Sequence, residues 1–194
     1  MFSLSKPLIL ASNSPRRKQL LKEAGFTFEV EVLPTDETFP ASLQSGDIAA
    51  YISHQKAEMF KGIHTDKLVL TADTIVIQEN HVLGKPADKN DAVRMLMLLS
   101  GTTHEVITAV SLLTDETITT VSDVALVSFR KLELAEIVHY IEQYKPFDKA
   151  GSYGIQEWIG MIGIDKIEGS FYTIMGLPVH VVYQLLRPYI NRFS

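Results

Sequence analysis

Apolar and polar positions follow one another along the chain in blocks that predict both strands and helices. Residues 7–11 form a short apolar run typical of a buried strand, and residues 14–25 continue with a helical apolar stripe of Leu20, Leu21 and Ala24. The segments 104–114 and 116–130 predict two long antiparallel strands, and 133–146 has a strongly amphipathic helical pattern. The pattern further predicts helices over 48–62, 88–101 and 179–190, strands over 26–33 and within 68–84, and a short apolar strand between Gly169 and Gly176. Together these elements predict an α/β domain with a mixed sheet.

Several of these helices carry start and stop residues at the expected places. Ser14 is a candidate N-cap and Pro15 stands at the first helical position, where a missing N–H costs nothing. Gly25 can end the same helix. For the helix over 88–101, Asp88 and Asn90 are both candidate caps.

Composition narrows the class of protein further. The 194 residues make one domain, or one domain with two lobes, and the formal net charge of -5 argues against broad nucleic-acid binding. The chain has no cysteine, which fits a reducing cytoplasm better than secretion. It has no apolar run of the length that a membrane-spanning helix needs.

The polar elbow "SNSPRR" at 12–17 places two arginines where a helix begins. Cations are disfavoured at this end of a helix dipole, whereas free N–H groups and guanidinium groups there bind phosphate oxygens. Arg16 and Arg17 therefore predict a phosphate site; the alternative is an exposed first turn facing solvent. Neither GxxxxGK[ST] nor GxGxxG is present, so the elbow is not a P-loop.

One carboxylate, Asp73, lies inside the apolar segment "LVLTADTIVIQ", and buried carboxylates need a partner. Lys85 follows in the rigid sequence "LGKP", and Lys56 lies on the helix over 48–62. Asp36 and Glu37 lie in a loop, where one carboxylate could complete a Mg²⁺ site with Asp73. Each of these charges could equally be an ordinary surface or capping residue.

The remaining motifs exclude some chemistries and leave others open. The six histidines show no zinc-binding spacing and there is no GxSxG, so zinc and serine hydrolysis lack support. His104 is expected to make structural hydrogen bonds. In the glycine-rich segment 147–160, Gln156 could recognise a base edge, and Trp158 is expected to pack in the core.

Six motifs, "LASNSPRRKQLL", "ADTIV", "GKP", "SGTTHEVITAV", "DKAGSYGIQ" and "GSFYTIMGLP", resemble the Maf family of nucleoside triphosphate pyrophosphatases in order and spacing. The resemblance implies an elongated mixed β-sheet flanked by helices, with two lobes and a central cleft, similar to inosine triphosphate pyrophosphatases. Residues 1–194 would form this single domain. It also implies hydrolysis between the α and β phosphates with a divalent metal cation, Mg²⁺ or Mn²⁺.

Arg16, Thr74 and Gln156 resemble the subgroup that acts on dTTP and UTP. The alternatives are a pyrophosphatase for modified nucleotides and a nucleotide-binding regulator of cell division that does not hydrolyse its ligand. The resemblance also implies a homodimer. The composition, as given above, leads us to expect a cytoplasmic protein with no nucleic-acid or membrane partner. The implied roles are catalysis for Asp73, Lys56 and Lys85, substrate binding for Ser12, Arg16, Arg17, Thr74, Lys149 and Gln156, and metal binding for Asp73 and Glu37.

Overall fold

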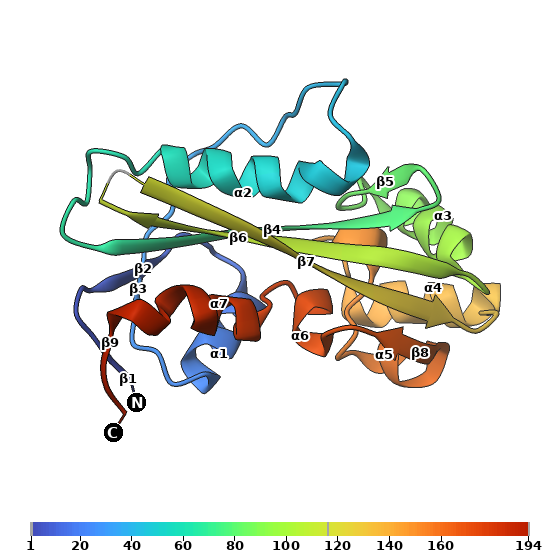
Figure 1. Cartoon of the computed structure of the whole chain (residues 1–194). Coiled ribbons are helices and arrows are strands. Elements are labelled where there is room, and N and C mark those ends of the chain that lie inside the picture. The colour runs from blue at the N-terminus through green and yellow to red at the C-terminus, as the bar shows by residue number, and fades with distance from the viewer. Residues whose placement is uncertain (1, 116, 194) are drawn as a thin grey trace. The chain divides into compact units, whose positions relative to one another are not determined.

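A seven-stranded mixed sheet organises the computed structural model, which describes residues 2–115 and 117–193 (Figure 1). Its strands lie in the order β3-β2-β4-β6-β7-β8, and β5 pairs with β4. β2 pairs in parallel with β3 and β4, whereas β4–β5 and β7–β8 are antiparallel. The bounds are β2 Leu8–Leu10, β3 Glu29–Val30, β4 Leu68–Gln78, β5 His81–Leu83, β6 Thr103–Thr114, β7 Thr117–Phe129 and β8 Ile164–Glu168. The predicted α/β class with a mixed sheet flanked by helices is confirmed.

The helices alternate with these strands along most of the chain. Their bounds are α1 Pro15–Glu23, α2 Ile48–Glu58, α3 Lys89–Leu99, α4 Leu134–Tyr144, α5 Trp158–Gly163, α6 Phe171–Ile174 and α7 Val179–Leu186, with 3₁₀ turns at Ser45–Asp47, Ala150–Ser152 and Arg187–Tyr189. Within the described residues, no helix combines the length and apolar character that crossing a membrane requires.

The chain divides into two compact units. The first comprises Met1–Asp73, Thr108–Asp123 and Gly176–Ser194, and the second comprises Thr74–Ile107 and Val124–Met175. The interpretation of residues 1–194 as one domain with two lobes stays a prediction.

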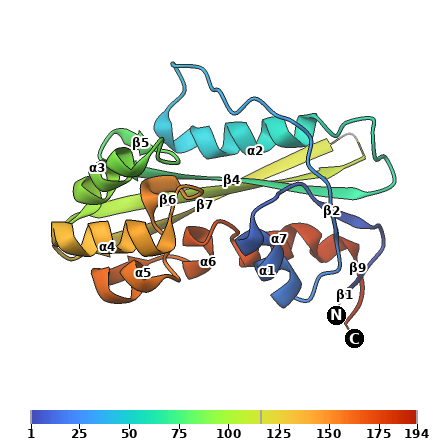
Figure 2. The same cartoon turned by 180° about the vertical axis from the view of Figure 1, so that it is seen from behind.

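In the first unit, helices lie on both faces of the strands. α2 covers one face, and α1 and α7 lie on the opposite face (Figures 1 and 2). The two ends of the chain meet where β1, Phe2–Leu4, pairs with β9, Ile190–Phe193. One core cluster of this unit is apolar throughout and consists of Ile9, Ala11, Ala57, Phe60, Val69 and Leu113.

The second unit has its own core, and α3 and α4 contact each other and pack against it. Leu96 and Leu99 of α3 and Ile137 and Tyr140 of α4 are all fully buried in it. Trp158 is partly buried against the same cluster, which agrees with the expected packing role.

Local signals predicted both ends of α1 and the start of α3, whereas α2 and α7 end at Glu58 and Leu186, before the predicted residues 62 and 190. Ser14 caps α1 through a hydrogen bond from the Arg17 N–H, and Gly25 follows the helix with a φ of +88°. Asp88 caps α3 by accepting from the Asp91 N–H at 2.9 Å, so it is the cap in preference to Asn90. These contacts span only a few residues, which is why the sequence reveals them.

Two strand predictions were wrong or too long. Of the strand expected over 26–33, only Glu29 and Val30 pair, because β2 offers only three residues as a partner. The strand expected between Gly169 and Gly176 is instead the one-turn helix α6. The strands β1, β8 and β9 were not predicted.

Candidate functional site

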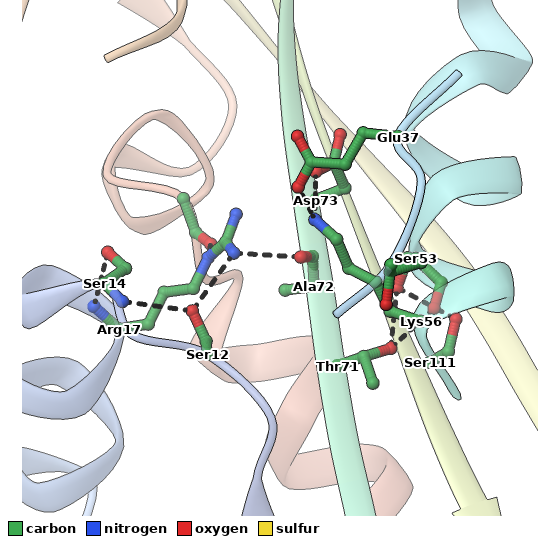
Figure 3. Close-up of polar contacts among 12 residues, drawn as sticks. Ser12, Ser14, Arg17, Glu37, Ser53, Lys56, Thr71, Ala72, Asp73 and Ser111 are labelled. Carbon is green, nitrogen blue, oxygen red and sulfur yellow. Dashed lines mark hydrogen bonds and ion pairs between the residues drawn. The ribbon is translucent and has the colours of Figure 1, made fainter. Parts of the chain in front are cut away.

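Lys56 stands between two carboxylates at the centre of the candidate site. Its Nζ lies 2.8 Å from Asp73 Oδ1 and 2.8 Å from Glu37 Oε1. The side chains of Lys56 and Asp73 are 16% and 13% exposed, whereas that of Glu37 is 49% exposed. The Lys56–Asp73 ion pair is therefore largely shielded from solvent, whereas the second carboxylate, that of Glu37, is more exposed (Figure 3).

Buried hydroxyl groups fix the helix that carries Lys56 against the strand that carries Asp73. Thr71 Oγ1 donates to the Ser53 carbonyl at 2.7 Å, and the two hydroxyl oxygens lie 3.2 Å apart. Ser53 Oγ also lies 2.9 Å from Ser111 Oγ. Residues two apart on a strand, and three apart on a helix, share a face, so Ser53–Thr71 and Lys56–Asp73 are neighbouring contacts between α2 and β4.

The elbow before α1 forms a compact set of hydrogen bonds. The Ser14 N–H donates to Ser12 Oγ at 3.2 Å, while Ser14 Oγ accepts from the Arg17 N–H at 3.5 Å. Pro15 occupies the first helical position, as predicted. The elbow therefore holds Arg17 in a defined place at the start of the helix.

The Arg17 guanidinium reaches across to β4 and binds backbone. Its Nε donates to the Gly176 carbonyl at 2.7 Å. Its NH1 donates to the Ala72 carbonyl at 2.9 Å (Figure 3). NH1 also lies 3.4 Å from Ser12 Oγ. Burial lowers the pKa of Arg17, as does Arg16, while the negative charges of Asp73 and Glu37 act in the opposite direction. Carbonyl oxygens and nearby carboxylates thus compensate a cation at the positive end of a helix dipole.

The structure also places the other predicted residues. Arg16 is partly exposed in the first turn of α1. The second unit contains Thr74, Lys85, Lys149 and Gln156; Thr74 is partly exposed, and Lys85 and Gln156 are exposed. The role of these residues in binding or catalysis stays a prediction.

Lys149 is buried, and its ammonium group is paired with two carboxylates. Nζ lies 2.8 Å from Asp148 Oδ1 and 3.1 Å from Glu157 Oε1. The other Glu157 oxygen accepts a hydrogen bond from the Tyr140 hydroxyl, which in turn accepts from the Gly154 N–H at 3.0 Å. This network fixes the segment immediately around Gln156.

The sequence interpretation missed the Ser53–Thr71–Ser111 hydroxyl contacts and the Tyr140–Glu157 pair. A weak signal was present for the hydroxyls, because Ser53 and Thr71 interrupt apolar positions of their elements. Neither the spacing nor the residue type indicates that Glu157 is paired with Tyr140.

Asp73 and Glu37 are the residues whose chemistry fits a divalent cation. Among the described residues, no group of three or more His, Cys, Asp or Glu side chains could hold a metal ion. However, Asp73 and Glu37 each have an oxygen 2.8 Å from the same ammonium nitrogen, so these two oxygens are at most twice that distance apart. Mg²⁺ commonly uses one or two carboxylates and takes its other ligands from phosphate and water.

Comparison with known proteins gives a consistent family match. A family described as Maf-like protein matches residues 7–189. A protein of Phocaeicola vulgatus named dTTP/UTP pyrophosphatase is 50% identical over 182 residues, covering 93% of this chain and 94% of that protein. A Porphyromonas gingivalis protein of the same name is 46% identical over 186 residues, covering 94% of each chain. Among solved structures, a Staphylococcus aureus Ham1 protein matches with a TM-score of 0.48 and 12% identity, covering 64% of this chain and 72% of that one.

Proposed function

Because the chain belongs to the Maf family, we propose that it is a pyrophosphatase that hydrolyses dTTP and UTP to the nucleoside monophosphate and pyrophosphate. The similar proteins carry the name dTTP/UTP pyrophosphatase and match nearly the whole chain. The observation that carries the proposal is the contact of Lys56 with both Asp73 and Glu37. This contact supports the proposal because it joins one cation to two carboxylates, of which Asp73 is proposed as the proton acceptor.

In the proposed reaction, Asp73 accepts a proton from the attacking water. The water oxygen forms a bond to the α-phosphorus, the bond from that phosphorus to the oxygen bridging to the β-phosphate breaks, and pyrophosphate leaves with the bonding electrons. Lys56 holds the Asp73 carboxylate in place and neutralises charge beside it. Fixed charges of this kind stabilise the transition state without reorganising during the reaction.

Asp73 and Glu37 would also hold the divalent cation, which supplies a Lewis acid for the phosphate oxygens. Ser12 and Arg16, with Lys85, are proposed to bind the phosphates, and Thr74 and Gln156 to recognise the base, with Lys149 beside them. The homodimer inferred from the family resemblance remains part of the proposal.

Phosphate release coupled to an added inorganic pyrophosphatase tests the function directly. We expect dTTP and UTP to be turned over faster than CTP, GTP and 7-methyl-GTP with Mg²⁺ or Mn²⁺, and Asp73→Asn to lose about 10²-fold or more in rate. Binding without hydrolysis of any nucleotide would contradict the proposal and favour a nucleotide-binding regulator. A preference for a modified nucleotide would keep the reaction and change the substrate.

A further inference from the structure

The pairing of β2 with one edge of β4 ends just before Asp73. β2 pairs with β4 up to Leu10 opposite Leu70, and the Ala11 N–H then donates to the Leu70 carbonyl at 2.8 Å. After Ala11 the chain turns away into the elbow of Ser12 to Ser14. Carbonyl groups alternate between the two edges of a strand, so the Ala72 carbonyl points to the same edge as that of Leu70.

Arg17 supplies the donor that a longer β2 would otherwise have provided. Its NH1 donates to the Ala72 carbonyl at 2.9 Å, while its Nε binds the Gly176 carbonyl at 2.7 Å. Ala72 is fully buried and Gly176 is buried. Without the Arg17 guanidinium, each carbonyl oxygen would be kept from water and would lack this hydrogen-bond donor. An unsatisfied buried acceptor costs about 1–3 kcal/mol.

The Ala72 carbonyl belongs to the peptide group that continues into Asp73. A hydrogen bond that holds this carbonyl therefore also holds the peptide plane, which ends at the Asp73 Cα to which the side chain is attached. Lys56 then holds the carboxylate at the other end of the side chain, 2.8 Å from Oδ1. The residue is constrained at its backbone from α1 and at its carboxylate from α2.

We propose that Arg17 is a positioning residue: its guanidinium binds the Ala72 and Gly176 carbonyls and thereby sets the Asp73 carboxylate for proton transfer. This role rests on the proposed pyrophosphatase function. It gives Arg17 a different role from that of Arg16, for which phosphate binding is proposed. A guanidinium holds two carbonyls in a fixed fork geometry, whereas the single ammonium of lysine lacks this planar fork.

The kinetic test compares Arg17→Lys with Arg16→Lys, and uses Arg94→Lys as a matched control. Arg94 is an exposed helical arginine paired with Asp91 at 2.7 Å. For R17K we expect kcat for dTTP to fall about 10- to 100-fold and KM to change by less than about twofold, because a misplaced group affects the chemical step. For R16K we expect a raised KM, and for R94K unchanged kinetics. An unchanged kcat in R17K, or a raised KM with kcat retained, would overturn the positioning role.

A second measurement uses the wild-type protein without substrate. In ¹⁵N-detected NMR, the Arg17 Nε–H should exchange with water more slowly in the folded protein than in the urea-unfolded chain, because it is held by the Gly176 carbonyl. Equal, fast exchange in the two states would overturn the proposal even if R17K does not fold. If the wild type hydrolyses no nucleotide but Arg17 is protected, the proposed function fails and the backbone contacts stand.

Discussion

Lys56 Nζ lies 2.8 Å from Asp73 Oδ1, and the same nitrogen lies 2.8 Å from Glu37 Oε1. One ammonium group therefore separates two carboxylates that would otherwise repel each other at short range. Removing it changes both the local charge and the position of the proposed base.

We expect Lys56→Ala to lower kcat for dTTP by about 10²-fold, because it removes a fixed cation from the transition state and releases Asp73. Steady-state kinetics over a range of dTTP concentrations measures this. The matched control is Lys61→Ala, which removes a lysine that is 35% exposed and paired with Glu58 at 2.7 Å. A K56A protein as active as K61A would exclude Lys56 from catalysis.

Glu157 should contribute to folding through Lys149. The Lys149 side chain is 9% exposed. Glu157→Gln removes one of the two carboxylates that contact its ammonium group and leaves only that of Asp148, whose side chain is more exposed. We expect E157Q to lower the free energy of unfolding by about 2 kcal/mol, measured by urea denaturation. The matched control, Glu142→Gln, breaks a pair with Lys89 in which both side chains are about half exposed, and should cost less than about 0.5 kcal/mol. Equal costs would contradict the structural role of the buried pair.

His104 should make the stability of the protein depend on pH. The residue is 2% exposed, its Nε2 lies 2.8 Å from the Tyr153 hydroxyl, and burial lowers its pKa from 6.5 to about 4. Between these values the unfolded chain binds a proton that the folded protein does not. The free energy of unfolding therefore rises with pH across this window, by up to about 1.4 kcal/mol per pH unit.

Carboxylates such as Glu29 and Glu136 also have a lowered pKa and contribute in the same direction at the acid end of the window. The difference between wild type and His104→Gln isolates the histidine, because the amide of glutamine can still bond to Tyr153. We expect the excess slope to disappear in H104Q when urea unfolding is measured at a series of pH values. Parallel pH profiles for the two proteins would show that His104 does not titrate as its burial implies.

Much of the fold could be predicted because its signals are local. Ser14 and Asp88 mark helix starts by hydrogen bonds within one turn, and the long apolar runs mark β4 and β6. The one-turn helix α6 and the short extent of β3 within the strand expected over 26–33 could not be predicted, because few residues repeat a pattern in either. Pairing of β3 depends on how far β2 extends, which is decided by contacts distant in sequence.

The candidate site was predictable where a side chain is unusual for its surroundings. Asp73 interrupts an apolar strand. Lys56 and Glu37 were candidates from their charge, the family resemblance gave them roles, and the structure places both beside Asp73. The partners of Arg17 could not be predicted, since a backbone carbonyl leaves no mark in the residue type. For the same reason the arginines were interpreted as phosphate ligands, whereas Arg17 also holds backbone.

Gln156 offers a test of base recognition that is separable from folding. It is exposed, while the five residues before it are buried, so its amide can change without disturbing the core. An amide both donates and accepts, as a uracil or thymine edge requires, whereas a carboxylate only accepts. We expect Gln156→Glu to lower kcat/KM for dTTP and UTP by about tenfold or more with an unchanged melting temperature. The comparison uses both nucleotides and a thermal denaturation curve of each protein. If Q156E turned over dTTP and UTP as the wild type does and melted at the same temperature, Gln156 would have no part in reading the base.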